Sequence, residues 1–533
     1  MNKAGSITKK LKRQSGLESG LTTMEIMIAM FIFVLTISAV IMVLFGGQST
    51  EIDTETNQEA LYFAQEELEN TRAQSRGTVG EFNSIISTTP TTTDIYTKTL
   101  EVLDISPCVK EIKSTIDWDV ENRPQSISIS SIIGSLKAFI DAGSNCSIIS
   151  PSNDNWRNPV TNHDNIIINT VNGESIAVLN KIVYLGVYDS NENLDDLFIY
   201  DAANTSNPVF LGSIGVDWGP GKKLNGIVDL VAVDFQSLNK RYIFAASIHG
   251  DFYDPDDGSG SGNEKASGQL QVIDVTDPAA PIQIASVSLP GVSGTCNFTC
   301  PGGRSIAYYN NRIYIGTHRV GGSEFHIFDV TDPTNPVHLG NTGSTQVDHN
   351  INDIEVREDR AYLATSSNNE EIIVLNIANP LNITIAGTFD AERADGSASS
   401  KDGRDLYVIG NKIYLGIGRS NPGNDRDFYV VDTNDLSSAP GSVNFNDFFN
   451  YNQGAGITGI KVSGQLAFVT TRDPNDPFLV LDVSDPANIE RWDTCPYNFS
   501  VDPQNFAYEN DVIYTVTNQQ SKLRIIEPSP VCN

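Results

Sequence analysis

The chain has 533 residues, a formal net charge of −31 and 39% hydrophobic residues. A chain of this length exceeds what a single compact core contains, so we expect two or more folded units. A surface this acidic repels phosphate groups, which argues against nucleic acid as a partner.

The first 45 residues contain a short basic leader followed by an apolar segment. The leader ends at Gly20, and residues 26–45 are apolar apart from Thr36 and Ser38. Twenty apolar residues in a helix rise about 30 Å, which is enough to cross the core of a bilayer. A secretory signal is cleaved after its apolar segment, whereas here the small residue at a cleavable position lies before it. The basic leader favours a cytoplasmic N-terminus, so we expect the rest of the chain outside the cytoplasm.

This arrangement resembles the class III leader of type IV prepilins. The resemblance implies cleavage between Gly20 and Leu21 by a prepilin peptidase, with N-methylation of Leu21. It also implies that Glu25 acts in assembly by meeting the N-terminal amine of a neighbouring pilin, since a carboxylate at the edge of a membrane helix is costly unless it is paired. The chain is then expected to be a single-pass protein of the inner membrane before assembly, and to lie on a pilus at the cell surface afterwards. The alternative is an ordinary signal anchor, in which Glu25 is only interfacial.

After the apolar segment, the sequence predicts a stem in which a helix packs on a sheet. Small and apolar residues recur at helical spacing after residue 57, namely Ala60, Leu61, Ala64 and Leu68. This spacing predicts one continuous helix over residues 21–73. Residues 95–119 and 126–133 alternate in part between apolar and polar side chains, as strands do. The pattern resembles the globular part of a minor pilin or pseudopilin, and the alternative is a generic α+β stalk without a filament role.

The remainder of the chain repeats a pair of motifs. One copy is Phe325-His-Ile-Phe-Asp-Val-Thr-Asp-Pro333, and a second motif, such as Arg312-Ile-Tyr-Ile-Gly316, precedes it. A period of about 40–65 residues with about four short strands is typical of propeller blades. The Asp-Val-Thr-Asp-Pro form resembles the LVIVD repeat family, which implies a β-propeller and says little about activity.

The repeats predict seven blades. Their first strands are expected near Ser175, Gly226, Arg304, Ile351, Gly403, Ile457 and Pro503. The last blade lacks its outermost strand, and residues 158–171 have the pattern of the missing one. The ring is therefore expected to close when this N-terminal strand completes the C-terminal blade, which removes both sheet edges. The aspartates that end the third strands are expected to cap the turns that follow, and these are Asp201, Asp274, Asp329, Asp432 and Asp482.

The predicted fold class is mainly β. It combines a long N-terminal transmembrane pilin helix and a small α+β pilin domain with a seven-bladed β-propeller. The expected domains are the prepilin leader over 1–20, the pilin-like helix and stem over 21–150, and the LVIVD-type propeller over 151–533.

Acidic loops on the propeller are candidate calcium sites, since loops on a rigid ring often carry binding residues. The first set has the alternate spacing of calcium ligands, without the central Gly and the distal Glu of an EF-hand loop, and comprises Asp189, Asn191, Asn193 and Asp195. A second oxygen cluster comprises Asp251, Asp254, Asp256 and Asp257. The alternative for both is a solvated acidic turn that binds no Ca²⁺.

Two further sets of residues are candidates for binding and for covalent stabilisation. Three arginines fall just past the second strand of their repeats and could ring a pocket for an anionic ligand, and these are Arg319, Arg419 and Arg472. Surface charge without function is the alternative. Six cysteines in an exported chain fit disulfides, and their positions suggest the local pairs Cys108 with Cys146, Cys296 with Cys300, and Cys495 with Cys532. Other connectivities stay open, because six cysteines can pair in 15 ways.

The sequence contains no His-Glu-x-x-His, Gly-x-Ser-x-Gly or phosphate-loop motif, so no catalytic residues are predicted. The expected function is that of a minor pilin-like cell-surface protein, which enters a type IV pilus or pseudopilus and displays a ligand-binding propeller for adhesion. The expected partners are the prepilin peptidase, other pilins or pseudopilins, the inner membrane and an unidentified surface ligand, glycan or protein. The alternatives are a membrane-anchored surface enzyme and a type II secretion pseudopilin whose propeller contacts substrate or cargo.

Overall fold

The computed structural model describes the chain from residue 54 to residue 531. Internal segments outside the description are 121–122, 142–154, 168–171, 189–193, 220–221, 224–225, 249–267, 293–301, 320–321, 344–346, 392–401, 419–425, 438, 440, 444–455, 474–475, 496–502 and 518–521. The chain divides into two compact units. The described part of the first unit comprises residues 54–68, 90–99 and 113–131, and the second comprises 69–89, 100–112 and the chain from 132 onwards. This division leaves the predicted domain limits at residues 20 and 150 as predictions.

Helix α2 (Thr54–Ser75) packs on a four-stranded meander. The strands pair in sequence order, and they are β1 (Thr91–Thr93), β2 (Tyr96–Ser106), β3 (Val109–Val120) and β4 (Arg123–Gly134). Within the first unit, Ala60 and Ala64 lie one turn apart on α2 and are fully buried in a cluster with Ile116 and Trp118. The buried Tyr96 joins this cluster, and its hydroxyl donates a hydrogen bond to the Thr56 carbonyl at 3.2 Å.

The predicted continuous helix over residues 21–73 is not what the structure describes. Helix α2 begins at Thr54, and it carries glutamates such as Glu59 and Glu66, whose charges a bilayer core excludes. No helix among the described residues is long and apolar enough to span a membrane. Residues 26–45, on which the transmembrane prediction depends, lie outside the described residues.

We therefore correct the predicted fold class and the predicted localisation. The described chain is mainly β, its α-helices are α2, α3 (Val79–Asn83) and α4 (Leu136–Asp141), and neither a long N-terminal transmembrane helix nor a single-pass membrane protein is supported. The prediction failed because the helical spacing after residue 57 does not show where the helix begins.

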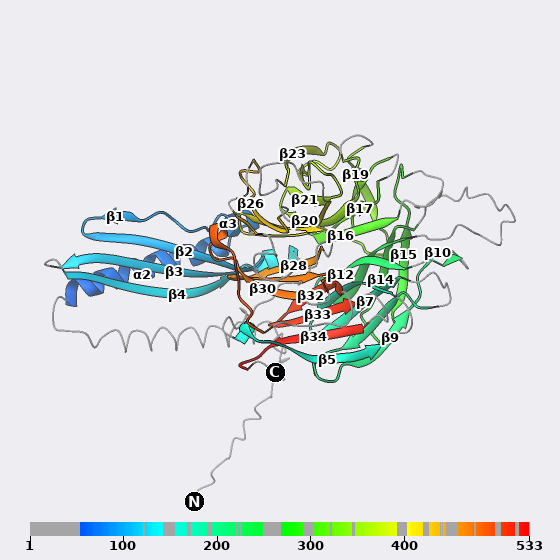
Figure 1. Ribbon diagram of the computed structural model, residues 1–533. Coiled ribbons are helices and arrows are strands. Elements are labelled where there is room, and N and C mark those ends of the chain that lie inside the picture. The colour runs from blue at the N-terminus through cyan, green and yellow to red at the C-terminus, as the bar shows by residue number, and fades with distance from the viewer. Residues whose placement is uncertain are drawn as a thin grey trace, which may run out of the picture. The chain divides into compact units, whose positions relative to one another are not determined.

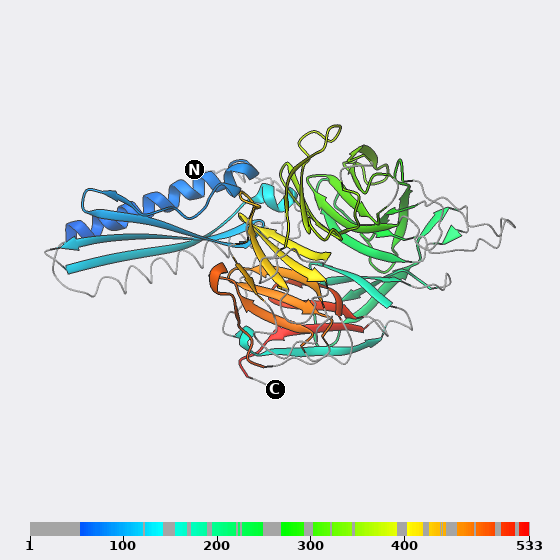
Figure 2. The ribbon, with the colours of Figure 1, turned by 45° about the horizontal axis from the view of Figure 1, so that its top comes forward.

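The second unit contains seven four-stranded sheets arranged as the blades of a β-propeller (Figures 1 and 2). The first strands of blades 1 to 7 are β6 (Asn172–Leu179), β12 (Ile227–Phe235), β16 (Gly303–Tyr309), β20 (Ile351–Arg357), β24 (Asp402–Ile409), β28 (Ile457–Ser463) and β32 (Pro503–Glu509). The second strands are β7 (Ile182–Tyr188), β13 (Lys240–Ser247), β17 (Arg312–Thr317), β21 (Arg360–Thr365), β25 (Lys412–Gly418), β29 (Leu466–Thr471) and β33 (Val512–Thr517). First strands of neighbouring blades contact one another around the whole ring, so they line its axis.

The third and fourth strands complete each blade. The third strands are β8 (Leu197–Asp201), β14 (Leu270–Asp274), β18 (Phe325–Asp329), β22 (Ile372–Asn376), β26 (Phe428–Asp432), β30 (Phe478–Asp482) and β34 (Lys522–Pro528). The fourth strands are β9 (Val209–Ile214), β15 (Ile282–Val287), β19 (Val337–Asn341), β23 (Thr384–Phe389), β27 (Gly441–Val443), β31 (Glu490–Arg491) and β5 (Pro159–Ile167). Smaller elements are the two-stranded ribbon of β10 (Asp217–Gly219) with β11 (Lys222–Lys223), and the short 3-10 helices η1 (Asn155–Arg157) and η3 (Pro486–Asn488).

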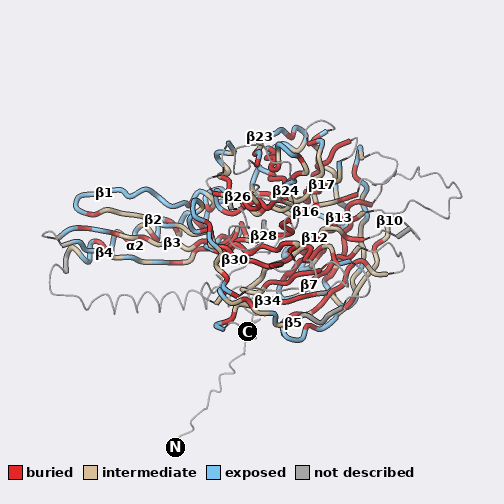
Figure 3. Tube along the Cα trace, in the orientation of Figure 1, coloured by how far each residue is buried: buried red, intermediate tan, exposed pale blue. Residues whose placement is uncertain are grey.

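The core of the propeller lies along the second and third strands (Figure 3). All six residues of β29 are buried, as are the first four residues of β22. Each blade packs between two neighbours, so both faces of these strands are covered, and their sequences are continuous apolar runs without alternation. The fourth strands lie at the outside, where Val209 and Ile282 remain 54% and 61% exposed.

The N-terminal strand β5 closes the ring by pairing antiparallel with β34 of the C-terminal blade, where Pro159 lies opposite Pro528 and Ile166 opposite Leu523 (Figure 1). The turns after the third strands are capped by aspartates. The backbone N–H two residues further on donates to the carboxylate at 2.8–2.9 Å in every case, for Asp201, Asp274, Asp329, Asp432 and Asp482. These aspartates are structural, as the sequence predicts.

Candidate ligand-binding site

Each of the seven first strands carries a β-bulge near its beginning. The pairing with the second strand slips by one residue there, for example between Gly303 and Ser305 of β16. The extra residue of a bulge has no partner across the ladder, and bulges commonly re-aim a side chain next to a functional site. We call these seven extra residues the bulge ring, and they are Glu174, Val228, Arg304, Asn352, Arg404, Thr458 and Gln504. Since the first strands line the axis, the bulge ring surrounds one end of the central channel.

Arg304 is held in this ring by uncharged neighbours. Its Nε donates to the Asn352 side-chain oxygen at 2.7 Å, and its Nη1 lies 3.4 Å from Nδ1 of His318. The Asn352 amide in turn donates to the Gly403 carbonyl at 2.6 Å. This chain of contacts runs from blade 3 through blade 4 to blade 5, so it fixes the positions of the side chains at the channel end.

Arginines and carboxylates of the described residues act on one another at the bulge ring. Burial and the neighbouring charge of Arg404 lower the pKa of Arg304 to about 10, while Asp402 and Glu174 act in the opposite direction. Burial raises the pKa of Glu174, an effect that Arg404 and Arg472 oppose. These interactions show that the charges of the described residues lie near one another at this channel end.

His318 is uncharged at neutral pH. Burial and the charge of Arg304 lower the pKa of its imidazole to about 4. Its ring therefore supports Arg304 as a neutral hydrogen-bonding group and adds no charge of its own.

The residues one step further along the channel join neighbouring blades. The carboxylate of Asp229 in blade 2 accepts the N–H of Ile306 in blade 3 at 2.9 Å. The carboxylate of Asp353 in blade 4 accepts the N–H of Leu406 in blade 5 at 3.0 Å. Asp405 makes the same kind of contact with Ile460 of blade 6. We call these three residues the aspartate layer, and their contacts make the wall of the channel rigid.

Lys461 compensates part of the negative charge of this layer. Burial opposes its protonation, but Glu355, Asp405 and Asp353 outweigh that effect and raise the pKa of Lys461. Burial together with the charge of Asp353 raises the pKa of Asp229 to about 7. Burial and Asp353 likewise raise the pKa of Asp405. The middle of the channel is thus a buried acid–base cluster, whose role in holding the blades together is structural.

The other end of the channel is covered by the turn between β2 and β3. A cavity of about 210 Å³ extends from the aspartate layer to Ile105, Ser106 and Pro107 at this turn. The hydroxyl of Ser463, the last residue of β28, donates to the Ile105 carbonyl at 3.1 Å. Because the bulges lie at the beginning of the first strands and Ser463 at the end of one, the turn and the bulge ring lie at opposite ends of the channel.

The structure describes two of the three predicted anion-binding arginines, so the predicted pocket stays a prediction. Arg319 is 61% exposed along its side chain and forms an ion pair with Asp348 at 2.8 Å. Arg472 acts electrostatically on Glu174 and Arg304, so it lies near the bulge ring. Arg419 lies outside the described residues.

One residue of the predicted calcium sets is described. The carboxylate of Asp195 accepts the hydroxyl of Ser213. Among the residues that the structure describes, no three His, Cys, Asp or Glu side chains lie together as metal ligands. Seven predicted ligands lie outside the described residues, so the calcium sites stay predictions, and these are Asp189, Asn191, Asn193, Asp251, Asp254, Asp256 and Asp257.

The processing residues and most of the cysteines also lie outside the described residues. Gly20, Leu21 and Glu25 belong to the undescribed N-terminal segment, so their predicted roles stay predictions. Cys108 and Cys495 are disulfide-bonded, and no described cysteine is free. The predicted pairing stays a prediction, because the remaining cysteines are not described, and these are Cys146, Cys296, Cys300 and Cys532.

Sequence reasoning missed Glu174, Arg304 and Arg404 as site residues. A signal for them exists, since Gly173-Glu-Ser175, Gly303-Arg-Ser305 and Gly403-Arg-Asp405 each have a glycine, a charged residue and a small polar or acidic residue at the beginning of a blade. The one-residue slip that places these side chains in one ring becomes visible only in the strand register.

Comparisons with known proteins support the propeller. Residues 456–492, which form blade 6, match the model of the LVIVD repeat. No curated protein sequence matches the chain. The match covers only part of the propeller, and the comparisons give no support to the prepilin resemblance.

Solved structures that align with this chain include BamB from Moraxella catarrhalis, at 12% identity and a TM-score of 0.39 over 67% of this chain and 85% of that one. Sqt1 from Saccharomyces cerevisiae has 13% identity and a TM-score of 0.38 over 66% and 81%. A quinonprotein alcohol dehydrogenase-like protein from Bacteroides thetaiotaomicron has 14% identity and a TM-score of 0.39 over 74% and 83%. Likeness at this level carries no argument about function. The seven sheets thus form a β-propeller in which blade 6 matches the LVIVD repeat.

Proposed function

We propose that this chain is a binding protein without catalytic activity, whose propeller binds a surface ligand, glycan or protein, at the bulge ring. The observation that carries the proposal is the ring itself. Seven equivalent backbone positions carry side chains of different kinds, and arginine is the only kind that occurs twice. The hydrogen bonds of the aspartate layer make the channel wall that holds them rigid. A rigid scaffold with a varied set of polar side chains is suited to selective binding.

The role that we propose for this binding is adhesion, with the propeller displayed by a minor pilin-like assembly. The support for the display is the leader sequence around Gly20 and the packing of α2 on a four-stranded meander, which is the helix-and-sheet arrangement expected for the globular part of a pilin. N-terminal sequencing of the native chain tests it. A mature chain that begins at Leu21 supports the display, and a chain that begins at Met1 contradicts it.

Ligand binding is tested by screening the full-length chain against arrayed glycans and surface proteins, with calcium and with a chelator. A variant Val228→Tyr places a bulky side chain in the bulge ring. We expect it to weaken binding of any ligand found by about tenfold or more, which corresponds to about 1.4 kcal/mol. The matched control is Leu238→Tyr, since Leu238 is 48% exposed in the turn at the opposite end of blade 2.

Two results would contradict the proposal. One is the absence of any ligand in the screen. The other is equal affinity of the parent chain, the Val228→Tyr variant and the Leu238→Tyr variant, which would place the binding residues elsewhere on the protein.

A further inference from the structure

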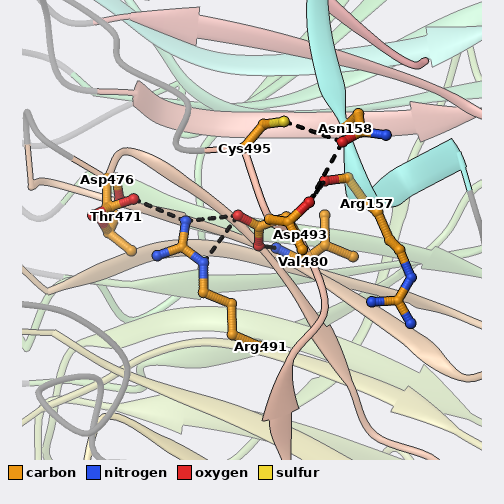
Figure 4. Close-up of polar contacts among 9 residues, drawn as sticks. Arg157, Asn158, Thr471, Asp476, Val480, Arg491, Asp493 and Cys495 are labelled. Carbon is orange, nitrogen blue, oxygen red and sulfur yellow. Dashed lines mark hydrogen bonds and ion pairs between the residues drawn. The ribbon is translucent and has the colours of Figure 1, made fainter. Parts of the chain in front are cut away.

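Three half-buried arginines in the described part of the propeller, Arg241, Arg357 and Arg491, have a carboxylate partner. Arg491 forms ion pairs with Asp476 at 2.9 Å and with Asp493 at 2.6 Å (Figure 4). Arg241 is paired with Asp234 at 2.6 Å, and Arg357 with Glu355 at 3.0 Å. In a protein with a net charge of −31, carboxylates are plentiful, so such pairing is the expected outcome.

Arg304 and Arg404 depart from this pattern. The hydrogen-bonding partners of Arg304 are Asn352 and His318, and no described carboxylate lies at ion-pair distance from Arg304 or from Arg404. Both side chains are half-buried. Two guanidinium groups that lie close enough to affect each other can together bind one anionic group.

The next inference rests on the function proposed above and specifies its ligand. We propose that the bulge ring binds one compact anionic group of the ligand, a carboxylate or a phosphate, between Arg304 and Arg404. Asn352, which lies in the blade between them, keeps Arg304 in position. Glu174, on the same ring, limits the excess of positive charge. Arg472 adds a third cationic group nearby.

The charge of the whole protein restricts the ligand further. A highly charged polyanion is repelled by the net charge of −31 before it reaches the channel. A ligand with one acidic group on an otherwise neutral body meets less repulsion, and its anionic group can make short-range contacts with both guanidinium groups. The favoured ligand class is therefore a singly acidic saccharide or a small phosphorylated or carboxylated molecule.

The test measures binding of three probes to the full-length chain by titration calorimetry: galacturonate, inorganic phosphate and the neutral sugar galactose. We expect saturable binding of galacturonate, of phosphate or of both, and none of galactose. Binding of galacturonate alone identifies the group as a carboxylate, and binding of phosphate alone identifies it as a phosphate. The double variant Arg304→Gln with Arg404→Gln is expected to weaken binding of the anion at least tenfold.

Controls separate loss of charge from loss of structure. Arg360→Gln removes an exposed arginine at the opposite end of the hairpin of blade 4 and is expected to leave binding unchanged. Arg304→Lys with Arg404→Lys retains the charge and is expected to bind more tightly than the glutamine variant. Thermal melting of each variant verifies that it is folded.

The inference is overturned if neither anion binds saturably, if galactose binds as well as galacturonate, or if the folded glutamine variant keeps the affinity of the parent. These outcomes are distinct from failure of the proposed function. A ligand from the array could bind the Val228→Tyr variant weakly and the glutamine variant as tightly as the parent. This result would support ligand binding at the bulge ring and would contradict only the proposal that the bound group is an anion.

Discussion

Single buried carboxylates before the third strands explain part of the acidic composition. Asp196 and Glu371 are 5% and 0% exposed. The N–H of Val216 donates to the Asp196 carboxylate at 2.8 Å, and the N–H of Ala391 donates to the Glu371 carboxylate at 2.8 Å. In blade 2 the same task is performed by an amide, since the N–H of Leu289 donates to the side chain of Gln269. These side chains tie the end of the outer strand to the third strand, so they are structural and not ligands.

The charge of Glu371 is not needed for this role. Burial raises its pKa to about 8, against the hydrogen bond from Ala391. A folded-state pKa above the unfolded value stabilises the fold at low pH, and this contribution is lost as the pH rises from about 4.5 to about 8. We expect Glu371→Gln, which keeps the acceptor, to be more stable than the parent at pH 8.5 by about 1 kcal/mol or more, and to lose this advantage at pH 5.

Urea unfolding at the two pH values measures the difference. Glu490→Gln, at an exposed glutamate on β31, is the matched control and is expected to have the pH dependence of the parent. Parallel pH profiles for Glu371→Gln and the parent would show that the buried carboxyl is not protonated in the folded state.

At the scale of the element, the first strands of blades 2 to 5 combine two functions. The bulge of each strand directs one side chain to the channel end, and the next residue holds the neighbouring blade. Asp353 illustrates the second function, since it accepts the N–H of Leu406 at 3.0 Å across the boundary between blades 4 and 5. Ser305 performs the equivalent task between blades 3 and 4 by donating to the Ile351 carbonyl at 3.1 Å.

Loss of the Asp353 carboxylate leaves the backbone N–H of Leu406 without an acceptor. We expect Asp353→Ala to destabilise the propeller by about 1–3 kcal/mol, the typical cost of a buried unsatisfied group. Asp353→Asn keeps an acceptor oxygen and is expected to retain most of the parent stability, and the exposed Asp359→Ala in the next turn is expected to change little. The midpoints of chemical unfolding compare the three variants. Equal losses for Asp353→Ala and Asp353→Asn would show that the charge matters and the hydrogen bond does not.

At the scale of the whole molecule, stability depends on closure of the ring by a segment far away in the sequence. Trp156, just before β5, is fully buried and packs on Phe468 of blade 6 with ring centroids 4.8 Å apart. Its indole N–H donates to the carboxylate of Asp511 in blade 7 at 2.7 Å. Trp156 therefore joins the last two blades at the point where the N-terminal strand enters the ring.

Removal of this side chain should loosen the closure. We expect Trp156→Ala to cost about 3–5 kcal/mol, the usual loss for a large buried aromatic residue. Faster hydrogen exchange is expected in β32, β33 and β34, because their blade loses its fixed fourth strand. Leu381→Ala is the control, since Leu381 is 86% exposed. Unchanged exchange in these strands would show that the ladder between β5 and β34 closes the ring without Trp156.

The sequence predicted the repeating architecture because each blade is built from local patterns. Strands such as β18 are recognisable as short apolar runs that end in a turn with a capping aspartate, and the missing fourth strand of the last blade pointed to residues 158–171. The same local reasoning failed at the N-terminus, where helical spacing suggested a helix longer than α2.

By itself, the sequence determined that this protein contains a seven-fold repeat of four strands, closed by an N-terminal strand, with structural aspartates at the turns. The repeat and its turns depend on patterns local to each blade, and the closure was predicted because the last repeat lacks a strand that the N-terminal segment can supply. Only the tertiary structure decided which side chains meet at the channel, because Arg304 and Arg404 lie one hundred residues apart and are brought together by bulges in strand pairing. A one-residue slip changes the direction of a side chain without changing the composition around it, so no count of residues reveals it.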